Sequence, residues 1–195
     1  MIDDPSDQRR LFGIKDPCFP KAGVSPANID TACTTTVSFS SLGNASTSAG
    51  STDDDGWYIN LDLCMDSSGT VVSCSDTTAV FRTERVVTDP VAAPNGAVFF
   101  TTSNPTADTC EYGGASHIWA VRYDTGGSLS GTGILRGKAI VQVSTGAIEE
   151  VDLATAFTER ENRRTGSIQG LPPSGGLSLV VPPTPIKKIL HMRKQ

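Results

Sequence analysis

The five cysteines are the residues whose chemistry the sequence specifies best. Cys64 and Cys74 flank a segment that reads as strand, turn and strand, and a hairpin brings two Cα atoms within the roughly 4.4–6.8 Å that a disulfide needs. Cys18 and Cys33 are a second pair that could close a local loop. Disulfides persist in oxidising compartments, so these pairs favour an extracellular protein over five reduced cysteines. Cys110 is then free or bonded elsewhere.

Other groups with metal-binding or catalytic chemistry are sparse. Asp53, Asp54 and Asp55 form an acidic run, but a calcium loop presents six to eight oxygens from alternate residues, so calcium here is a weak alternative to a solvated loop. The absence of a Cys-x-x-Cys motif argues against zinc and haem sites. Neither His117 nor His191 has a recognisable nucleophile as its partner. We therefore expect no enzyme and no cofactor.

Glu84 and Arg85 are adjacent charges within an expected strand. Successive side chains of a strand point to opposite faces, so one of the two charges must be covered. This predicts a buried, paired charge that holds neighbouring elements together. Trp57 and Trp119 lie in strands of alternating polarity, where aromatic residues are more typical of a core than of a contact surface.

The charge of the chain is uneven. The net charge of −5 argues against a broad nucleic-acid-binding surface. Residues 158–195 nevertheless hold seven Lys or Arg and two acids. This basic segment could dock onto an acidic partner, or it could be a solvated strand edge guarded by lysines. The residues expected to make such a partner contact are Lys187, Lys188, Arg193 and Lys194.

The ends of the chain show neither a membrane span nor an export signal. No apolar stretch reaches the roughly 20 residues that a span requires. The first residues lack the apolar segment of a signal peptide, so we expect a piece of a longer protein or a separately encoded subunit. Residues 186–193 alternate between apolar and basic, which predicts an outer or closing strand.

Short β-branched and aromatic runs, separated by Ser, Thr and Gly turns, predict an all-β fold in a single domain over residues 1–195. Residues 152–162 are the one helix candidate. Residues 25–55 and 132–164 are expected to be insertions or irregular loops. The expected strands are residues 10–14, 36–42, 56–63, 70–73, 79–88, 97–102, 117–124, 138–143, 177–181 and 187–192.

Residues 84–127 have the order of strands and turns that a β-propeller blade needs. One strand ends at Asp89-Pro90, and the Pro-Asn-Gly sequence that follows supplies the positive φ of a hairpin turn. The next strand, residues 97–102, is apolar enough to be covered on both faces, and a third strand, residues 117–124, ends in another turn signal. A blade contains four antiparallel strands in about 40–45 residues, so the chain holds roughly three or four blades.

This pattern resembles a quinoprotein-type propeller blade, and in its details the chain resembles the PilY family of type IV pilus proteins. The similar motifs touch most of the chain, with gaps in residues 25–55 and 132–164. They are Gln8, Phe12-Gly13-Ile14 and Asp16; Gly56-Trp57-Tyr58; Glu84-Arg85-Val86 with Asp89-Pro90; Phe99-Phe100-Thr101-Thr102; Pro105, Cys110, Gly113-Gly114 and Trp119; and the C-terminal segments GLPP, GLSLV and KKILHMR.

The resemblance implies a partial or modified β-propeller that works outside the cell in type IV pilus biogenesis and surface adhesion. It implies contacts with minor pilins or other pilus or filament subunits, and further chains could complete the propeller. The family's calcium loop and long N-terminal part have no counterpart here. One alternative is a structural subunit that coats or caps another extracellular filament. A quinoprotein-like dehydrogenase fragment is less favoured, because no two cysteines are adjacent and a partial ring encloses no cofactor.

Overall fold

The computed structural model describes residues 8–19, 32–52, 54–107, 114–142, 148–169 and 178–180. Within these ranges the one helical element is the 3-10 turn η1, Phe39–Ser41, and no helix is long and apolar enough to cross a bilayer. The all-β fold class expected from the sequence is confirmed. The strands are β1 (Arg10–Ile14), β2 (Gly43–Asn44), β3 (Gly56–Asn60), β4 (Arg85–Val86), β5 (Val91–Ala92), β6 (Ala97–Pro105), β7 (Gly114–Arg122), β8 (Lys138–Gln142), β9 (Ile148–Asp152), β10 (Phe157–Glu159), β11 (Arg164–Thr165), β12 (Ile168–Gln169) and β13 (Ser178–Val180).

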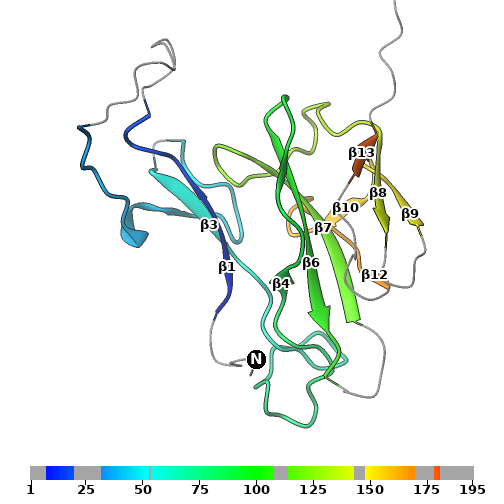
Figure 1. Cartoon of the computed structure of the whole chain (residues 1–195). Coiled ribbons are helices and arrows are strands. Elements are labelled where there is room, and N and C mark those ends of the chain that lie inside the picture. Colours follow the sequence, from blue (N-terminus) through cyan, green and yellow to red (C-terminus); the bar gives the residue numbers. More distant parts are fainter. Residues whose placement is uncertain are drawn as a thin grey trace, which may run out of the picture.

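The strands form three sheets (Figure 1). The first sheet has the order β1-β3-β2. The central sheet has the order β10-β11-β7-β6-β4, with β5 paired to β6 and β12 paired to β7. The third sheet has the order β13-β8-β9. The described strands form no closed barrel and no ring of blades.

The antiparallel pair β6–β7 is the centre of the core, and residues 99–104 and 116–121 are all buried. Its two faces carry separate hydrophobic clusters. The first cluster is Ala97, Phe99, Ile118, Ala120, Leu129, Ala139, Leu153 and Phe157. The second is Ala45, Trp57, Ile59, Leu61, Phe100, Trp119 and Val121. The central sheet is therefore a middle layer, with the first sheet on one face and β8 of the third sheet on the other.

The turn between β5 and β6 has the conformation that its Pro-Asn-Gly sequence predicts. Gly96 has a φ of +88°, which L side chains rarely adopt. The Gly96 N–H donates to the Ala93 carbonyl oxygen over 3.1 Å. This turn sets the register in which Val91 pairs with Phe99, and so aligns β5 on the edge of the central sheet.

Residues 152–162 do not form a helix, and the prediction for this segment is wrong. The Asp152 carboxylate accepts a hydrogen bond from the Ala154 N–H, which starts a turn before β10. Residues 160–162 all have positive φ and turn the chain into β11. Leu153 and Phe157 have the spacing of one helical face, yet both enter the core from a turn and a short strand. Asp side chains compete with helical hydrogen bonding in this way.

Other segments also differ from the expected elements. Within residues 132–164, β8 matches the strand expected at residues 138–143, while β9 and β10 lie where an insertion or irregular loop was expected. Residues 36–42 contain η1 rather than a strand. Within residues 70–73 the pairing is a single bridge from Val71 to Met65. Residues 187–192, expected as a strand, lie outside the described residues.

Both expected disulfides are present. Cys18 and Cys33 have their Cα atoms 5.5 Å apart, and Cys64 and Cys74 have theirs 5.2 Å apart. The second bridge is buried and closes a short loop, which stabilises the fold by about 2–3 kcal/mol in the chain-entropy picture. Cys110 lies outside the described residues. The bridges are consistent with a non-cytoplasmic protein.

Candidate functional site

The first sheet places different residues on its two faces. In β1 and β3, Leu11 and Trp57 pack inward against the core. Trp57 lies so close to Gly13 that a Cβ at Gly13 would overlap the indole ring, so this glycine is what lets β1 approach. Phe12 lies opposite Tyr58, and both belong to the face that points away from the core.

That outward face is aromatic and exposed. Phe12, Phe39 and Ile14 are 45%, 53% and 61% exposed. The ring centroids of Phe39 and Tyr58 lie 4.8 Å apart, and that of Phe12 lies 6.3 Å from each. Contiguous apolar groups at a surface mark interaction sites more than scattered ones do. We call Arg10, Phe12, Ile14, Phe39 and Tyr58 the outer aromatic face.

Arg10 adds a fixed positive charge to the outer aromatic face. Its Cζ lies 5.3 Å from the ring centroid of Phe39 and 5.9 Å from that of Tyr58, within the range of cation–π attraction. Its Nε donates to Asn60 Oδ1 over 2.9 Å. A surface that combines rings with a positioned guanidinium has the composition of a protein-binding site.

The third sheet, at the other end of the stack, has a different outward face. Lys138 and Glu150 lie opposite Asp152 and Ile140 in the β8–β9 ladder and form an exposed ion pair with each other. Ile148 is an exposed large apolar side chain of this sheet, with 67% of its surface accessible. The aromatic cluster therefore distinguishes the first sheet from the third.

Behind the first sheet, Glu84 is buried, and both of its carboxylate oxygens accept hydrogen bonds. Its side chain is 0% exposed. Oε1 accepts hydrogen bonds from Thr102 Oγ1 and from Trp119 Nε1, at 2.5 and 3.2 Å. Oε2 accepts from the Asp62 N–H over 2.8 Å and lies 3.2 Å from Arg164 Nη1. The buried, paired charge expected at Glu84-Arg85 is Glu84, while Arg85 is half-buried.

Arg164 extends this contact into a network. Its Nη1 lies 2.6 Å from Asp62 Oδ2, and its Nη2 lies 2.8 Å from Glu159 Oε2. Arg160 forms a further ion pair with Asp62. The guanidinium of Arg164 also lies 5.5 Å from the Trp119 ring centroid. We call this set of contacts the Glu84 network. Each of its carboxylates contacts a cation, so none is a free acid or base. The network joins the segments after β3 to β10 and β11.

Arg163 is a second buried cation, and its acceptors are backbone carbonyl oxygens. Its Nη2 donates to Ser46 O over 2.9 Å, and its Nη1 donates to Gly126 O over 3.0 Å and also to Ala45 O. Its Nε donates to Arg160 O over 2.9 Å. Burial lowers the pKa of Arg163, and the negative charge of Glu161 opposes that shift. The residue ties the first sheet to the turn after β7.

His117 lies beside the Glu84 network and is buried. Its Nδ1 is 3.0 Å from Thr165 O, which selects the tautomer that carries a proton on Nδ1. Burial lowers the pKa of His117, and the positive charge of Arg164 lowers it further. The neutral imidazole is therefore the form that the fold favours.

We expect this histidine to make the fold less stable in mild acid. The unfolded chain takes up a proton at His117 at a higher pH than the folded chain does, so the free energy of unfolding falls as the pH drops below about 6.5. Urea unfolding at several pH values measures how steeply the free energy of unfolding changes with pH. His117→Asn keeps a donor near Thr165 O but does not titrate, and it should flatten the slope. An equal slope in the variant would contradict this assignment.

The remaining predicted residues do not converge on a site. Asp89 and Pro90 are exposed between β4 and β5. Asp54 accepts a hydrogen bond from the Ser51 N–H, and Asp53 lies outside the described residues. Among the described residues no group of three or more His, Cys, Asp or Glu side chains could hold a metal ion. The expected partner contacts Lys187, Lys188, Arg193 and Lys194 also lie outside the described residues.

Sequence reasoning missed two features. Arg160, Arg163 and Arg164 were grouped with a basic docking segment, but their side chains are held by carboxylates and carbonyls inside the fold. The outer aromatic face was also missed. The alternation in RLFGI carried a signal for it, because Leu11 and Phe12 must point to opposite sides of a strand and both are large and apolar.

In comparisons with known proteins, no family model, no curated protein and no solved structure matches this chain. Its own surface and chemistry therefore have to indicate what it does.

Proposed function

We propose that this chain is a binding and assembly module of an extracellular type IV pilus system, and that it acts through protein–protein contact rather than catalysis. The observation that carries the proposal is the outer aromatic face. It is a sheet surface with three clustered rings, an exposed isoleucine and a positioned arginine. The occupant we assign to it is the apolar face of a β-sheet from a neighbouring pilus or filament subunit, such as a minor pilin.

The strand order and the face-to-face stacking of the sheets support a partial β-propeller. The strands β4 and β5, β6, β7, and β11 and β12 follow one another in antiparallel order, as in a four-stranded blade. Neighbouring blades of a propeller pack face to face, and the central sheet is covered in this way on both faces. The first sheet is covered on one face, so its outer face is where a further blade, from another chain, would pack.

The resemblance to the PilY family supports the choice of a pilus system. The motif residues Trp57, Glu84 and Trp119 are all buried, as residues packed between blades would be. The disulfides fit a location outside the cytoplasm. The module needs no cofactor, because its proposed action is contact between folded surfaces.

Changing Phe12 and Ile14 together to Ser should abolish assembly without unfolding the chain. The two side chains are 45% and 61% exposed, so the fold loses little, whereas an interface that buries them gains roughly 1.5–3 kcal/mol from each. We expect binding to weaken at least tenfold. Sedimentation velocity measures self-association, and biolayer interferometry measures binding to purified minor pilins.

Ile148→Ser is the matched control, because Ile148 is as exposed as Ile14 but lies on the third sheet. It should leave binding unchanged. Loss of pilin binding alone in the double variant identifies a pilus subunit as the occupant, and loss of self-association alone identifies a second copy. If the double variant binds and sediments as the unmodified chain does, the outer aromatic face is not the interface.

A further inference from the structure

A cavity of about 330 Å³ opens between the central sheet and the loop that leads into β8. Phe99 and Leu153 form its apolar base, and both belong to the hydrophobic cluster between these layers. Ala93 and Ile134 form apolar walls that pack against the same cluster. The cavity is thus an unfilled extension of the core, of a size that holds one large apolar side chain with its backbone groups.

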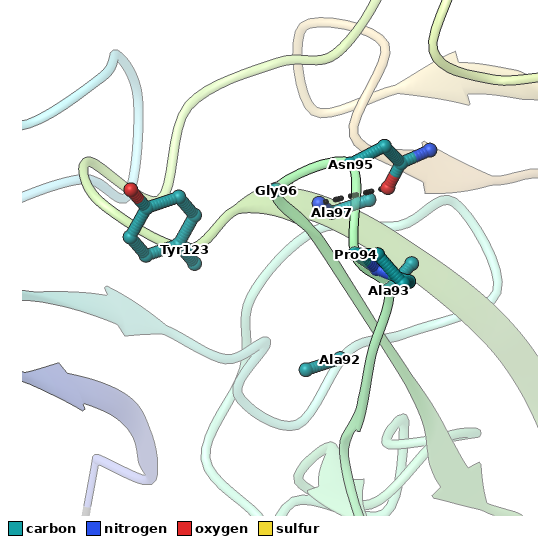
Figure 2. A pocket seen from close by; sticks show the side chains of 7 residues that line it. All are labelled: Ala92, Ala93, Pro94, Asn95, Gly96, Ala97 and Tyr123. Atoms are coloured by element: carbon teal, nitrogen blue, oxygen red, sulfur yellow. Dashed lines mark hydrogen bonds between the residues drawn. The ribbon is translucent and has the colours of Figure 1, made fainter.

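The polar groups at the rim hold the walls in place. Figure 2 shows the turn that forms one wall, with Asn95 extending away from Tyr123. Asn95 Oδ1 accepts from the Ala97 N–H over 3.3 Å, and Asn95 Nδ2 donates to Ile134 O over 3.4 Å. In the loop that supplies Gly133 and Ile134 to the cavity, Thr132 Oγ1 donates to Leu129 O. The cavity is therefore preformed, so a ligand would not have to order it.

Arg136 provides the charge at this rim. It is exposed, and neither an ion pair nor a hydrogen bond joins its guanidinium to another residue in the described part of the chain. Its Nη2 lies 3.5 Å from the position that a Cβ on Gly133 would take, so the guanidinium lies over the loop beside the cavity. A planar guanidinium with free N–H groups matches a carboxylate in two-point geometry.

A second cavity lies on the same turn but has different chemistry. It has a volume of about 550 Å³ and is lined by the turn, by Ala92 and by Tyr123, as Figure 2 shows. Among the described residues, no charged side chain lines this second cavity. Its walls are mostly backbone and alanine, so it offers neither a deep apolar base nor a charge to orient a ligand.

We propose that the cavity between Phe99, Ile134 and Leu153 binds a peptide group in which a large apolar side chain stands beside a carboxylate. The apolar side chain would fill the cavity, and the carboxylate would pair with Arg136. The carboxylate comes either from the C-terminus of a partner chain that ends in an apolar residue or from an Asp that precedes one. This site is separate from the outer aromatic face and does not depend on it.

The test is a titration of the full chain, followed by two-dimensional ¹H–¹⁵N NMR, with three probes. N-acetyl-L-phenylalanine carries the terminal carboxylate, N-acetyl-L-phenylalaninamide lacks it, and N-acetyl-L-aspartyl-L-phenylalaninamide moves it to a side chain. We expect a Kd of about 1 mM for at least one acidic probe. The shifts should centre on Asn95, Gly133 and Ile134. The neutral amide should bind about tenfold more weakly, as expected on losing a charge-assisted hydrogen bond.

Variants separate the two halves of the site. Arg136→Gln should weaken the acidic probe about tenfold, while Lys138→Gln removes a nearby charge and should change nothing. Ala93→Leu fills the cavity and should abolish binding of every probe while leaving Arg136 in place. Binding of the terminal acid alone assigns the site to chain ends, and equal binding of the aspartyl probe assigns it to internal sequences. Equal affinity for acid and amide, or an unchanged affinity in Arg136→Gln, would overturn the proposal.

Discussion

Replacing Arg164 with Met should lower the free energy of unfolding by about 3–5 kcal/mol, because it leaves the Glu84 carboxylate buried without its cation. Glu84 is fully buried, so water cannot replace the guanidinium. Asp62 keeps its ion pair with Arg160, so the loss is concentrated on Glu84. Urea unfolding followed by tryptophan fluorescence measures it, since the core contains both tryptophans of the chain.

Arg122→Met is the matched control for this measurement. Arg122 also pairs with a carboxylate, that of Asp124, at 2.7 Å, but its side chain is 42% exposed. An exposed pair of this kind contributes below about 1 kcal/mol. In a double-mutant cycle, adding Glu84→Gln to Arg164→Met should recover part of the lost stability, because the buried charge is then gone. Equal losses for Arg122→Met and Arg164→Met would show that the Glu84 network does not stabilise the fold.

The features predicted correctly from the sequence are those that local pattern determines. The strands β1, β3, β6 and β7 fall where runs of apolar and aromatic residues predicted strands, and each is confirmed. The Cys64–Cys74 bridge spans a short segment, so the two cysteines stay close to each other along the chain and a local pairing is favoured. One of the adjacent charges Glu84 and Arg85 was expected to be covered because a strand has only two faces, and Glu84 is the one that is buried.

The features that sequence reasoning missed depend on contacts between distant segments. Arg163 reaches carbonyls of Ala45 and Ser46, more than a hundred residues away along the chain, and no spacing rule connects them. Leu153 and Phe157 have a helical spacing that tertiary packing overrides. Whether the Phe12 side of β1 or the Leu11 side faces the core depends on which sheet lies behind it, and the sequence pattern is apolar on both sides.

Replacing Arg163 with Lys should cost about 2–4 kcal/mol of folding stability although it keeps the positive charge. The guanidinium donates to four backbone carbonyls, those of Ala45, Ser46, Gly126 and Arg160, and each bond from a charged donor contributes about 1.5–3 kcal/mol against water. A lysine ammonium is a single point with three donors and cannot span the same fork. At least one buried carbonyl then loses its partner.

Two comparisons separate this geometric role from a loss of charge or volume. Lys138→Arg is the reverse exchange, a guanidinium in place of an ammonium, at an exposed position. It should shift the free energy of unfolding by less than about 0.5 kcal/mol. Arg163→Met removes the charge and all four bonds, and it should be more destabilising than Arg163→Lys. Because the four carbonyls belong to the loop that follows β2 and to the turns after β7 and β10, hydrogen exchange in Arg163→Lys should accelerate first where the first sheet meets the central one. Unchanged exchange there, together with unchanged stability, would mean that Arg163 does not hold the two sheets together.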